Sequence, residues 1–125
     1  MGIGYFLTRE DLEKRQSWRM TEVISQMPGA SLLRTTSGHA YVSSAHASTS
    51  LGPGGRASIC LAVVNLDGVK VYAGKRGEAP FDINSVQTTE LEAIEYYASA
   101  VEAPAQYAGQ DVSCGVLLMW TRISP

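Results

Sequence analysis

The first thirty residues carry the spacing of two short helices. The run Leu7–Leu12 begins with two residues suited to a helix start: Leu7 and then Thr8, a good N-cap. Acids follow in the first turn, and Leu7 and Leu12 stand where a hydrophobic staple forms. This pattern predicts a helix that begins after Thr8 and continues to about Lys14.

A second helix is predicted from Ser17, which can serve as its N-cap. Its apolar residues follow the i, i+3, i+4, i+7 spacing of a buried helix face: Met20, Val23, Ile24 and Met27. Pro28-Gly29 ends the pattern, because proline disfavours helix in the residue before it and glycine turns the chain.

Beyond these helices the apolar runs are short and of strand length. They predict strands at Leu32–Leu33, Ala40–Val42, Ile59–Asn65, Val69–Tyr72, Ile94–Tyr97 and Gly115–Arg122. Ser37-Gly38 and Asp67-Gly68 are the turn signals between neighbouring runs. Ile59–Asn65 and the last run are apolar almost throughout, which is typical of strands buried on both faces.

Between the strands the chain is rich in small and turn-forming residues. Residues 43–57 and 74–82 are predicted to be flexible loops. Thr89–Glu92 offers a capping box for one helical turn, and Ala103–Tyr107 predicts a further short helix. The sum is an α+β fold, a small mixed β-sheet with two or three short helices, in one domain spanning residues 1–125.

Composition narrows the class of protein. The chain has 125 residues, 45% hydrophobic and 18% charged, with a net charge of -2. That balance gives no electrostatic reason to expect nucleic acid or an anionic membrane as a partner. No apolar run approaches the roughly 18 residues of a membrane helix, and the first residues do not form a signal peptide. We therefore expect no transmembrane segment, and either a cytoplasmic protein or a processed piece of an exported one.

The residues that usually carry catalysis are not arranged for it. His39 and His46 lack the tight spacing and the acidic or cysteine neighbours of a metal site. Gly52–Arg56 is followed by a strand, whereas a phosphate loop is followed by a helix. Glu92 and Glu95 are predicted to lie on different elements. We expect no enzyme, no cofactor and no metal.

Several segments, taken in order, share a pattern with a known family. They are Leu7–Leu12, the helix end Met27-Pro28-Gly29-Ala30, the Gly/Ser-rich loop with Arg56, the Leu66-Asp67-Gly68 turn, Thr89–Tyr97, Ala105–Gly109 and Cys114–Arg122. Together they resemble the plug domain of TonB-dependent receptors over nearly the whole chain. Ala30, Ala57 and Cys114 depart from the residues usual in that family, and no segment before Tyr5 resembles a TonB box.

The resemblance implies a fold and a cellular location. In a plug-like sheet the strands opened by Cys60 and Cys114 are both central and could be neighbours, so the two sulfurs could form a disulfide. The alternative is two buried free thiols. The disulfide depends on export to an oxidising compartment. The resemblance to receptor plugs itself implies a periplasmic or outer-membrane-associated protein.

The resemblance also suggests a function. We expect a non-catalytic, plug-like module of the periplasm or envelope that binds a protein partner, for example as an accessory subunit of a membrane complex or against a β-barrel. The candidate contact residues are Arg56, Tyr96, Tyr97 and Tyr107, because tyrosine is enriched in interfaces. Tyr96 and Tyr97 point to opposite faces of a strand, so we expect one buried and one exposed.

Two alternatives stay open. The chain could be the plug of a TonB-dependent outer-membrane transporter, which occludes the pore and contacts the ligand. Against this, the chain stops at Pro125, where a receptor begins its barrel, and a barrel needs at least about eight further strands. Reading the gene downstream of Pro125 separates the two. The other alternative, a cytoplasmic enzyme or small-molecule binder, predicts two reactive thiols in the native protein.

Overall fold

The computed structural model describes residues 4–44, 50–51, 57–58, 60–75, 77–99, 102–104 and 114–122. Its strands are β1 (Tyr5–Leu7), β2 (Ala30–Arg34), β3 (Ala40–Ser44), β4 (Ser50–Leu51), β5 (Ala57–Ser58), β6 (Val63–Leu66), β7 (Val69–Tyr72), β8 (Leu91–Tyr97) and β9 (Val116–Thr121). Its helices are α1 (Arg9–Glu13) and α2 (Met20–Ser25), with 3-10 turns η2 (Ile83–Ser85) and η3 (Thr88–Glu90).

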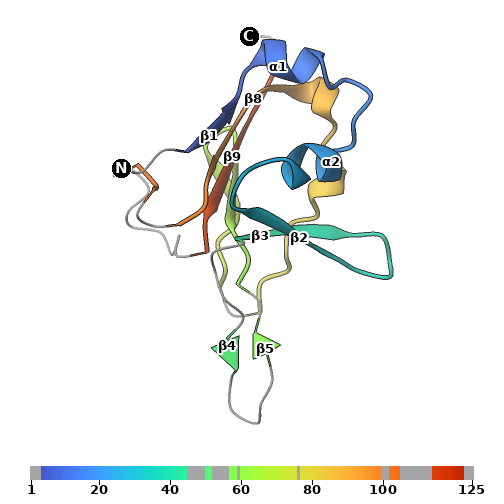
Figure 1. Cartoon of the computed structure of the whole chain (residues 1–125). Coiled ribbons are helices and arrows are strands. Elements are labelled where there is room, and N and C mark those ends of the chain that lie inside the picture. Colours follow the sequence, from blue (N-terminus) through green and yellow to red (C-terminus); the bar gives the residue numbers. More distant parts are fainter. Residues whose placement is uncertain are drawn as a thin grey trace.

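Five strands form the main sheet, in the order β1-β8-β9-β6-β7. The sheet is mixed: β6 pairs with β9 in parallel, and the other neighbours are antiparallel. Strands β8 and β9, with seven and six residues, are the two longest of the sheet. The predicted small mixed α+β fold is confirmed, with two short α-helices beside the sheet (Figure 1).

One face of the sheet, called the helix face below, carries the main core. Its sheet residues are Val64, Ile94, Tyr96, Leu117 and Met119, and they pack with residues of α1, α2 and the β2–β3 hairpin. Figure 1 shows α2 and this hairpin on the same side of the sheet. The second face carries a smaller buried cluster: Val63, Tyr97, Val116 and Leu118. The alternation of β9 between these two clusters follows from the two-residue period of a strand.

The first predicted helix is confirmed in its position and in its cap. Thr8 accepts the backbone N–H of Asp11, and the Asp11 carboxylate accepts the backbone N–H of Thr8 at 2.9 Å. This reciprocal capping box satisfies donors that a helix start otherwise leaves unpaired. Leu12 is buried as the staple predicts.

The second helix is also present, but Ser17 is not its cap. The N-cap is Arg19, whose backbone N–H donates to the Glu22 carboxylate at 2.8 Å. A capping box needs an acid three residues after the N-cap. Glu22 stands at that position relative to Arg19, whereas Met20 stands there relative to Ser17. Residues 15–18 form a turn instead, closed by a hydrogen bond from the Trp18 N–H to the Arg15 carbonyl.

The β2–β3 hairpin has the predicted turn around Ser37-Gly38, and Gly38 has a positive φ of 92°. The prediction of a continuous loop over residues 43–57 is wrong at both of its ends and at residues 50–51, where the structure has strands. Strand β3 extends to Ser44, and β4 pairs with β5 in a small antiparallel sheet, which Figure 1 shows below the rest of the fold. Two-residue strands without a strong apolar pattern escape a periodicity search.

The strand predicted at Ile59–Asn65 begins later than expected. It starts at Val63, and before it Leu61 makes only an isolated bridge to Ser43. Val63, Val64 and Asn65 are all buried, so burial on both faces is confirmed. The Asp67-Gly68 turn is confirmed too: both residues have a positive φ, of 52° and 82°, as a two-residue type I′ hairpin requires.

The helical turn expected at Thr89–Glu92 lies one residue earlier, at Thr88–Glu90. Its capping contact runs from the Gln87 N–H to the Glu90 carboxylate, and Glu92 belongs to β8. Glu92 contacts the Arg9 guanidinium at 3.7 Å instead. The helix predicted at Ala103–Tyr107 lies mostly outside the described residues.

Candidate functional site

The tyrosines predicted for partner binding lie on β8 and point to opposite faces of the sheet. Tyr96 belongs to the helix-face core, and Tyr97 belongs to the second-face cluster. Tyr96 is 1% exposed and Tyr97 is 5% exposed, so the expectation that one of them is exposed is wrong. Arg56 and Tyr107 lie outside the described residues. Partner contact by any of the four stays a prediction.

Tyr96 has a structural contact that explains its burial. Its hydroxyl donates to the Gly29 carbonyl at 3.2 Å, across 67 residues of sequence. Gly29 follows the end of α2, so this bond ties the chain after that helix to the central strand. Gly115 packs against the same hydroxyl: an added Cβ would lie 3.1 Å from it and 2.9 Å from the Tyr97 carbonyl.

The second face gathers a carboxylate and two aromatic donors. Glu95 and Tyr97 share this face because they are two residues apart on β8, and Trp120 reaches it from β9. The Tyr97 hydroxyl donates to one Glu95 oxygen and the Trp120 indole N–H donates to the other, each at 2.8 Å. Two donors on two oxygens hold the carboxylate in one orientation, and a carboxylate keeps further acceptor positions for a ligand.

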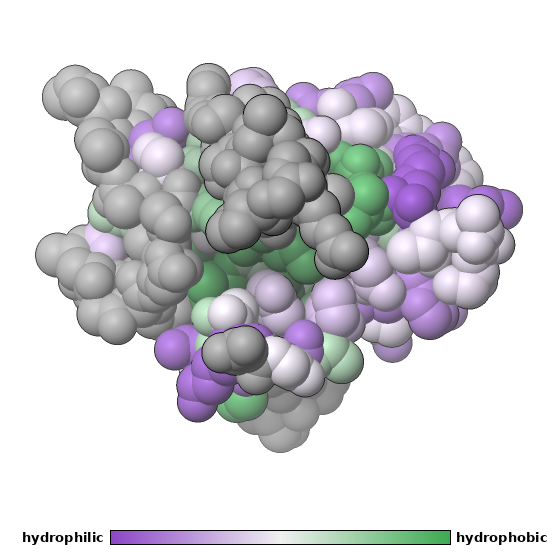
Figure 2. Space-filling view, turned by 90° about the horizontal axis from the view of Figure 1, so that it is seen from below, coloured by the Kyte–Doolittle hydropathy of each residue, from purple (hydrophilic) through white to green (hydrophobic). Residues whose placement is uncertain are grey.

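Phe6 extends this group to the edge of the sheet. It lies on β1 opposite Glu95, and its ring meets the Tyr97 ring edge-on with centroids 5.8 Å apart. Phe6 is 52% exposed, although aromatic rings are usually covered. Val69, 64% exposed on β7, is the other large exposed apolar residue that the described ranges contain. The molecule seen from below shows hydrophobic residues between polar and grey parts of the surface (Figure 2).

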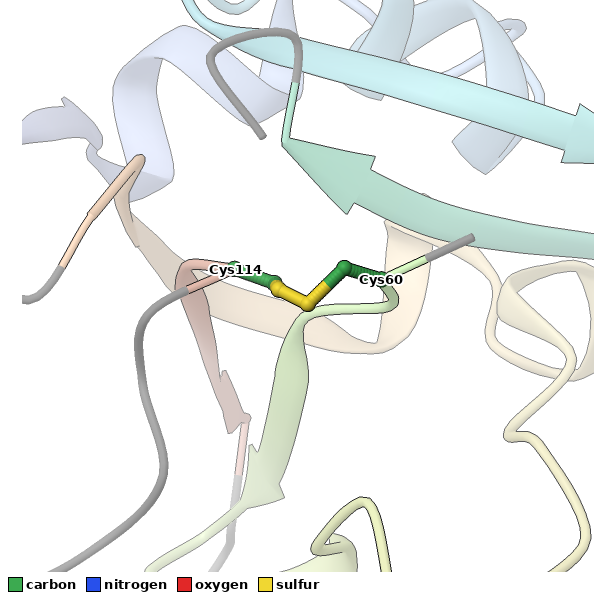
Figure 3. Close-up of a disulfide and its surroundings, with 2 residues drawn as sticks. All are labelled: Cys60 and Cys114. Carbon is green, nitrogen blue, oxygen red and sulfur yellow. A yellow bond between two sulfur atoms is a disulfide. The ribbon is translucent and has the colours of Figure 1, made fainter. Parts of the chain in front are cut away.

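Cys60 and Cys114 form a disulfide (Figure 3). This decides between the two hypotheses that the sequence left open, a disulfide and two buried free thiols. Their Cα atoms are 5.5 Å apart, a usual separation for a disulfide. Cys60 precedes β6 and Cys114 precedes β9, and these strands pair from Val63 with Val116 onward. The disulfide therefore lies where the two central parallel strands begin.

The other end of the same strand pair is held by a contact that sequence reasoning missed. The Asp67 carboxylate accepts the Thr121 backbone N–H at 2.8 Å and the Thr121 hydroxyl at 2.6 Å. The Asp67 N–H also donates to the Met119 carbonyl at 2.8 Å. The sequence identified Asp67 as a turn residue, and only the pairing of β6 with β9 brings it to Thr121, 54 positions away.

A second residue that the sequence analysis missed is Asn65, on strand β6. Its side chain is 4% exposed, and among the described residues its amide nitrogen has no hydrogen-bond partner. A buried donor left unpaired costs about 1–3 kcal/mol. Its signal in the sequence was a lone polar residue inside the apolar run Ile59–Asn65.

The loop after β7 is organised by one carboxylate. Glu78 accepts the backbone N–H groups of Ala73 and Lys75 at 3.0 Å. These backbone bonds, chiefly that from Lys75, lower the pKa of Glu78 from its ordinary value of 4.5. Burial raises the pKa of the neighbouring Tyr72, and the Glu78 charge adds to that increase. The predicted loop therefore has a defined internal contact.

His39 is exposed and its ring contacts Tyr41 (Nδ1 to hydroxyl 3.4 Å), while His46 lies outside the described residues. In the described ranges no group of three or more His, Cys, Asp or Glu side chains is placed to hold a metal ion. No helix in those ranges has the length and apolar character needed to cross a membrane.

No protein-family model matches the chain, and a comparison with curated proteins finds no match.

Proposed function

We propose that this protein is a non-catalytic, plug-like module of the cell envelope that binds a protein partner. The observation that carries the proposal is the disulfide-joined pair of central strands, β6 and β9. On the resemblance to receptor plugs, the strands after Cys60 and Cys114 are both central and could be neighbours. Their parallel pairing in the middle of a five-stranded sheet supports that reading of the fold.

The disulfide also supports a location in the envelope. Disulfides persist in oxidising compartments such as the periplasm and are rare in the cytosol. Because the two cysteines are 54 positions apart in the sequence, the bond also constrains a large part of the unfolded chain, so folding benefits from an oxidising environment.

The second face offers the surface that a partner would contact. Phe6 supplies an exposed ring, and the Glu95 carboxylate behind it is held in place by Tyr97 and Trp120. Interface hot spots combine a rigid aromatic group with a fixed polar group in this way. We assign the partner contact to this edge of the sheet, at β1 and β8.

Site-specific photo-crosslinking tests the assignment. A benzophenone side chain at position 6, in protein exported to the periplasm, should give a discrete crosslinked product with an envelope protein. The matched control places the same group at position 69, which is somewhat more exposed and lies on β7 at the opposite edge. Equal products at both positions, or none at position 6, would contradict the assignment.

Phe6→Ala provides the complementary test. Because the ring is half exposed, its removal should change the free energy of unfolding by about 1 kcal/mol or less. It should nevertheless reduce recovery of the crosslinked protein in a pull-down by a factor of about ten or more. Retention of full recovery by a folded Phe6→Ala protein would place the contact elsewhere.

The compartment is tested separately by the state of the thiols. Protein taken from cells under acid trapping should carry the Cys60–Cys114 disulfide and no reactive thiol at these positions. Two reactive thiols in the native protein would contradict an envelope location and favour a cytoplasmic role.

A further inference from the structure

A well-formed opening lined by described residues lies away from the second face. It is a cleft of about 480 Å³ between the segment that leads into α2 and the segment that contains η2 and η3. Its lining residues are Gln16, Trp18, Arg19, Met20, Asn84, Val86, Gln87, Thr88 and Thr89. Small-molecule sites in proteins have volumes of about 300–1,000 Å³, so the cleft has the size of a ligand site.

The floor of the cleft is apolar. Met20 is 1% exposed and Val86 is 8% exposed, and both belong to the helix-face core. Trp18 is half-buried and packs against the same core. The Arg15 guanidinium lies over the indole of Trp18, 5.2 Å from the ring centroid. The cleft therefore presents a rigid apolar surface to a ligand.

The shape of the cleft is held by a buried hydroxyl. Thr88 is 3% exposed, and its hydroxyl lies within 3.4 Å of the carbonyl oxygens of Arg15, Gln16 and Trp18. One residue of η3 thus fixes the turn that carries Trp18, across about 70 positions of sequence. A preformed wall of this kind reduces the ordering cost of binding.

The rim is polar and carries one kind of charge. Gln16, Gln87 and Thr89 are exposed there, and Arg19 is the one charged residue of the lining. Within the described ranges the Arg19 guanidinium has no ion pair, whereas Arg9 and Arg122 each contact a glutamate. The Glu22 carboxylate beside it accepts the backbone N–H of Arg19. An unpaired guanidinium at the mouth of an apolar cleft matches a carboxylate attached to an apolar group.

We propose that this cleft binds a small carboxylic acid with an apolar or aromatic body. The apolar body lies against Trp18, Met20 and Val86, the carboxylate pairs with Arg19, and the amides of Gln16 and Gln87 supply further hydrogen-bond donors. This site is independent of the partner contact at Phe6, because it lies on the side of the helix-face core.

The two tryptophans provide the test in one spectrum of the full chain. Each indole N–H gives one signal in a ¹⁵N correlation experiment. Trp18 lines the cleft, whereas Trp120 donates to Glu95 on the second face. Titration with 3-phenylpropanoate should move the Trp18 signal with a Kd on the order of 1 mM or tighter and leave the Trp120 signal in place. The neutral amide of the same acid should bind about tenfold more weakly, because it lacks the charge that Arg19 pairs with.

Variants separate the charge from the shape of the cleft. Arg19→Gln should weaken 3-phenylpropanoate about tenfold and bring acid and amide to the same affinity. Arg34→Gln, an exposed arginine on β2 outside the cleft, is the matched control and should leave binding unchanged. Thr89→Phe adds a ring to the cleft and should abolish binding of both probes, with the Trp120 signal reporting a folded protein.

The proposal would be overturned if the Trp18 signal does not move at a 3-phenylpropanoate concentration tenfold above about 1 mM. Equal movement of both indole signals would also overturn it, as would equal affinities of the acid and the amide for the wild-type protein.

Discussion

The two faces of the main sheet are built on different principles. On the helix face, Ile94, Leu117 and Met119 are fully buried under two helices and a hairpin, and the contacts are apolar. On the second face a smaller apolar cluster lies beside the Glu95 carboxylate with its two aromatic donors. It also lies beside Asn65, whose amide nitrogen has no hydrogen-bond partner in the part of the chain that the structure describes. Burial of apolar surface supplies stability, whereas fixed polar groups supply specificity at a cost. We infer that the helix face holds the fold and the second face serves contact.

Neighbouring leucines on β9 give the most direct test of this comparison. Leu117 points to the helix face and Leu118 to the second face. Replacement of a buried leucine by alanine costs about 2–5 kcal/mol, and more where the surroundings cannot collapse. We expect about 4 kcal/mol for Leu117→Ala and about 2–3 kcal/mol for Leu118→Ala, measured by urea unfolding. Equal losses would show that the faces are packed alike.

The disulfide fastens the strand pair that both faces share. Its loop of 54 residues predicts a stabilisation of about 4 kcal/mol in the chain-entropy account. Cys60→Ser/Cys114→Ser should lose about that amount in urea unfolding. Reduced wild-type protein should have the same free energy of unfolding as the variant. If the wild-type protein is equally stable with and without reductant, its stability comes from packing alone.

The clamp between Asp67 and Thr121 closes the other end of the strand pair. Asp67→Ala removes two hydrogen bonds and places alanine at a positive φ, so we expect a loss of about 2–3 kcal/mol. Asp67→Asn keeps an acceptor and tolerates the backbone, and should lose about 1 kcal/mol. Thermal unfolding of both proteins measures the difference. Equal losses would show that neither the hydrogen bonds nor the backbone conformation accounts for the effect, and would assign it to the charge that both variants remove.

On the second face, Trp120→Phe keeps the ring but removes the donor to Glu95. We expect a loss of about 1–2 kcal/mol, because the bond is charge-assisted and half-buried. Denaturant unfolding measures it, with Phe6→Ala as the comparison at an exposed ring. A loss as large as that of Leu117→Ala would show that the polar contacts of this face carry the fold.

The smallest effect should come from Glu78, outside both faces. Its folded pKa lies below 4.5, so it contributes stability above its unfolded pKa and loses it as the pH falls through the folded value. The midpoint of urea unfolding should therefore differ between wild type and Glu78→Gln at pH 7 and converge toward pH 3. A carboxyl NMR titration that places the pKa of Glu78 at 4.5 or above would contradict this.

Features that depend on residues a few positions apart could be predicted from the amino-acid sequence. Thr8 and Asp11 form their cap within one helical turn, and Asp67-Gly68 forms its turn with backbone angles that these two residues favour. The strand period likewise placed Tyr96 and Tyr97 on opposite faces. The prediction of Ser17 as the second N-cap failed because Arg19 competes for the same role, and the acid that completes the capping box, Glu22, stands three residues after Arg19.

Contacts between residues far apart in the sequence follow from the order and register of the strands and could not be predicted from local patterns. The pairing of β6 with β9 brings Cys60 to Cys114 and Asp67 to Thr121, and the register of β8 with β9 brings Trp120 to Glu95. The same packing buries Tyr96 in the helix-face core and Tyr97 in the second-face cluster, against the expectation that one of them is exposed. Periodicity gives the direction of a side chain on its own strand, but strand order and register determine its neighbours, and these come from packing of the whole chain.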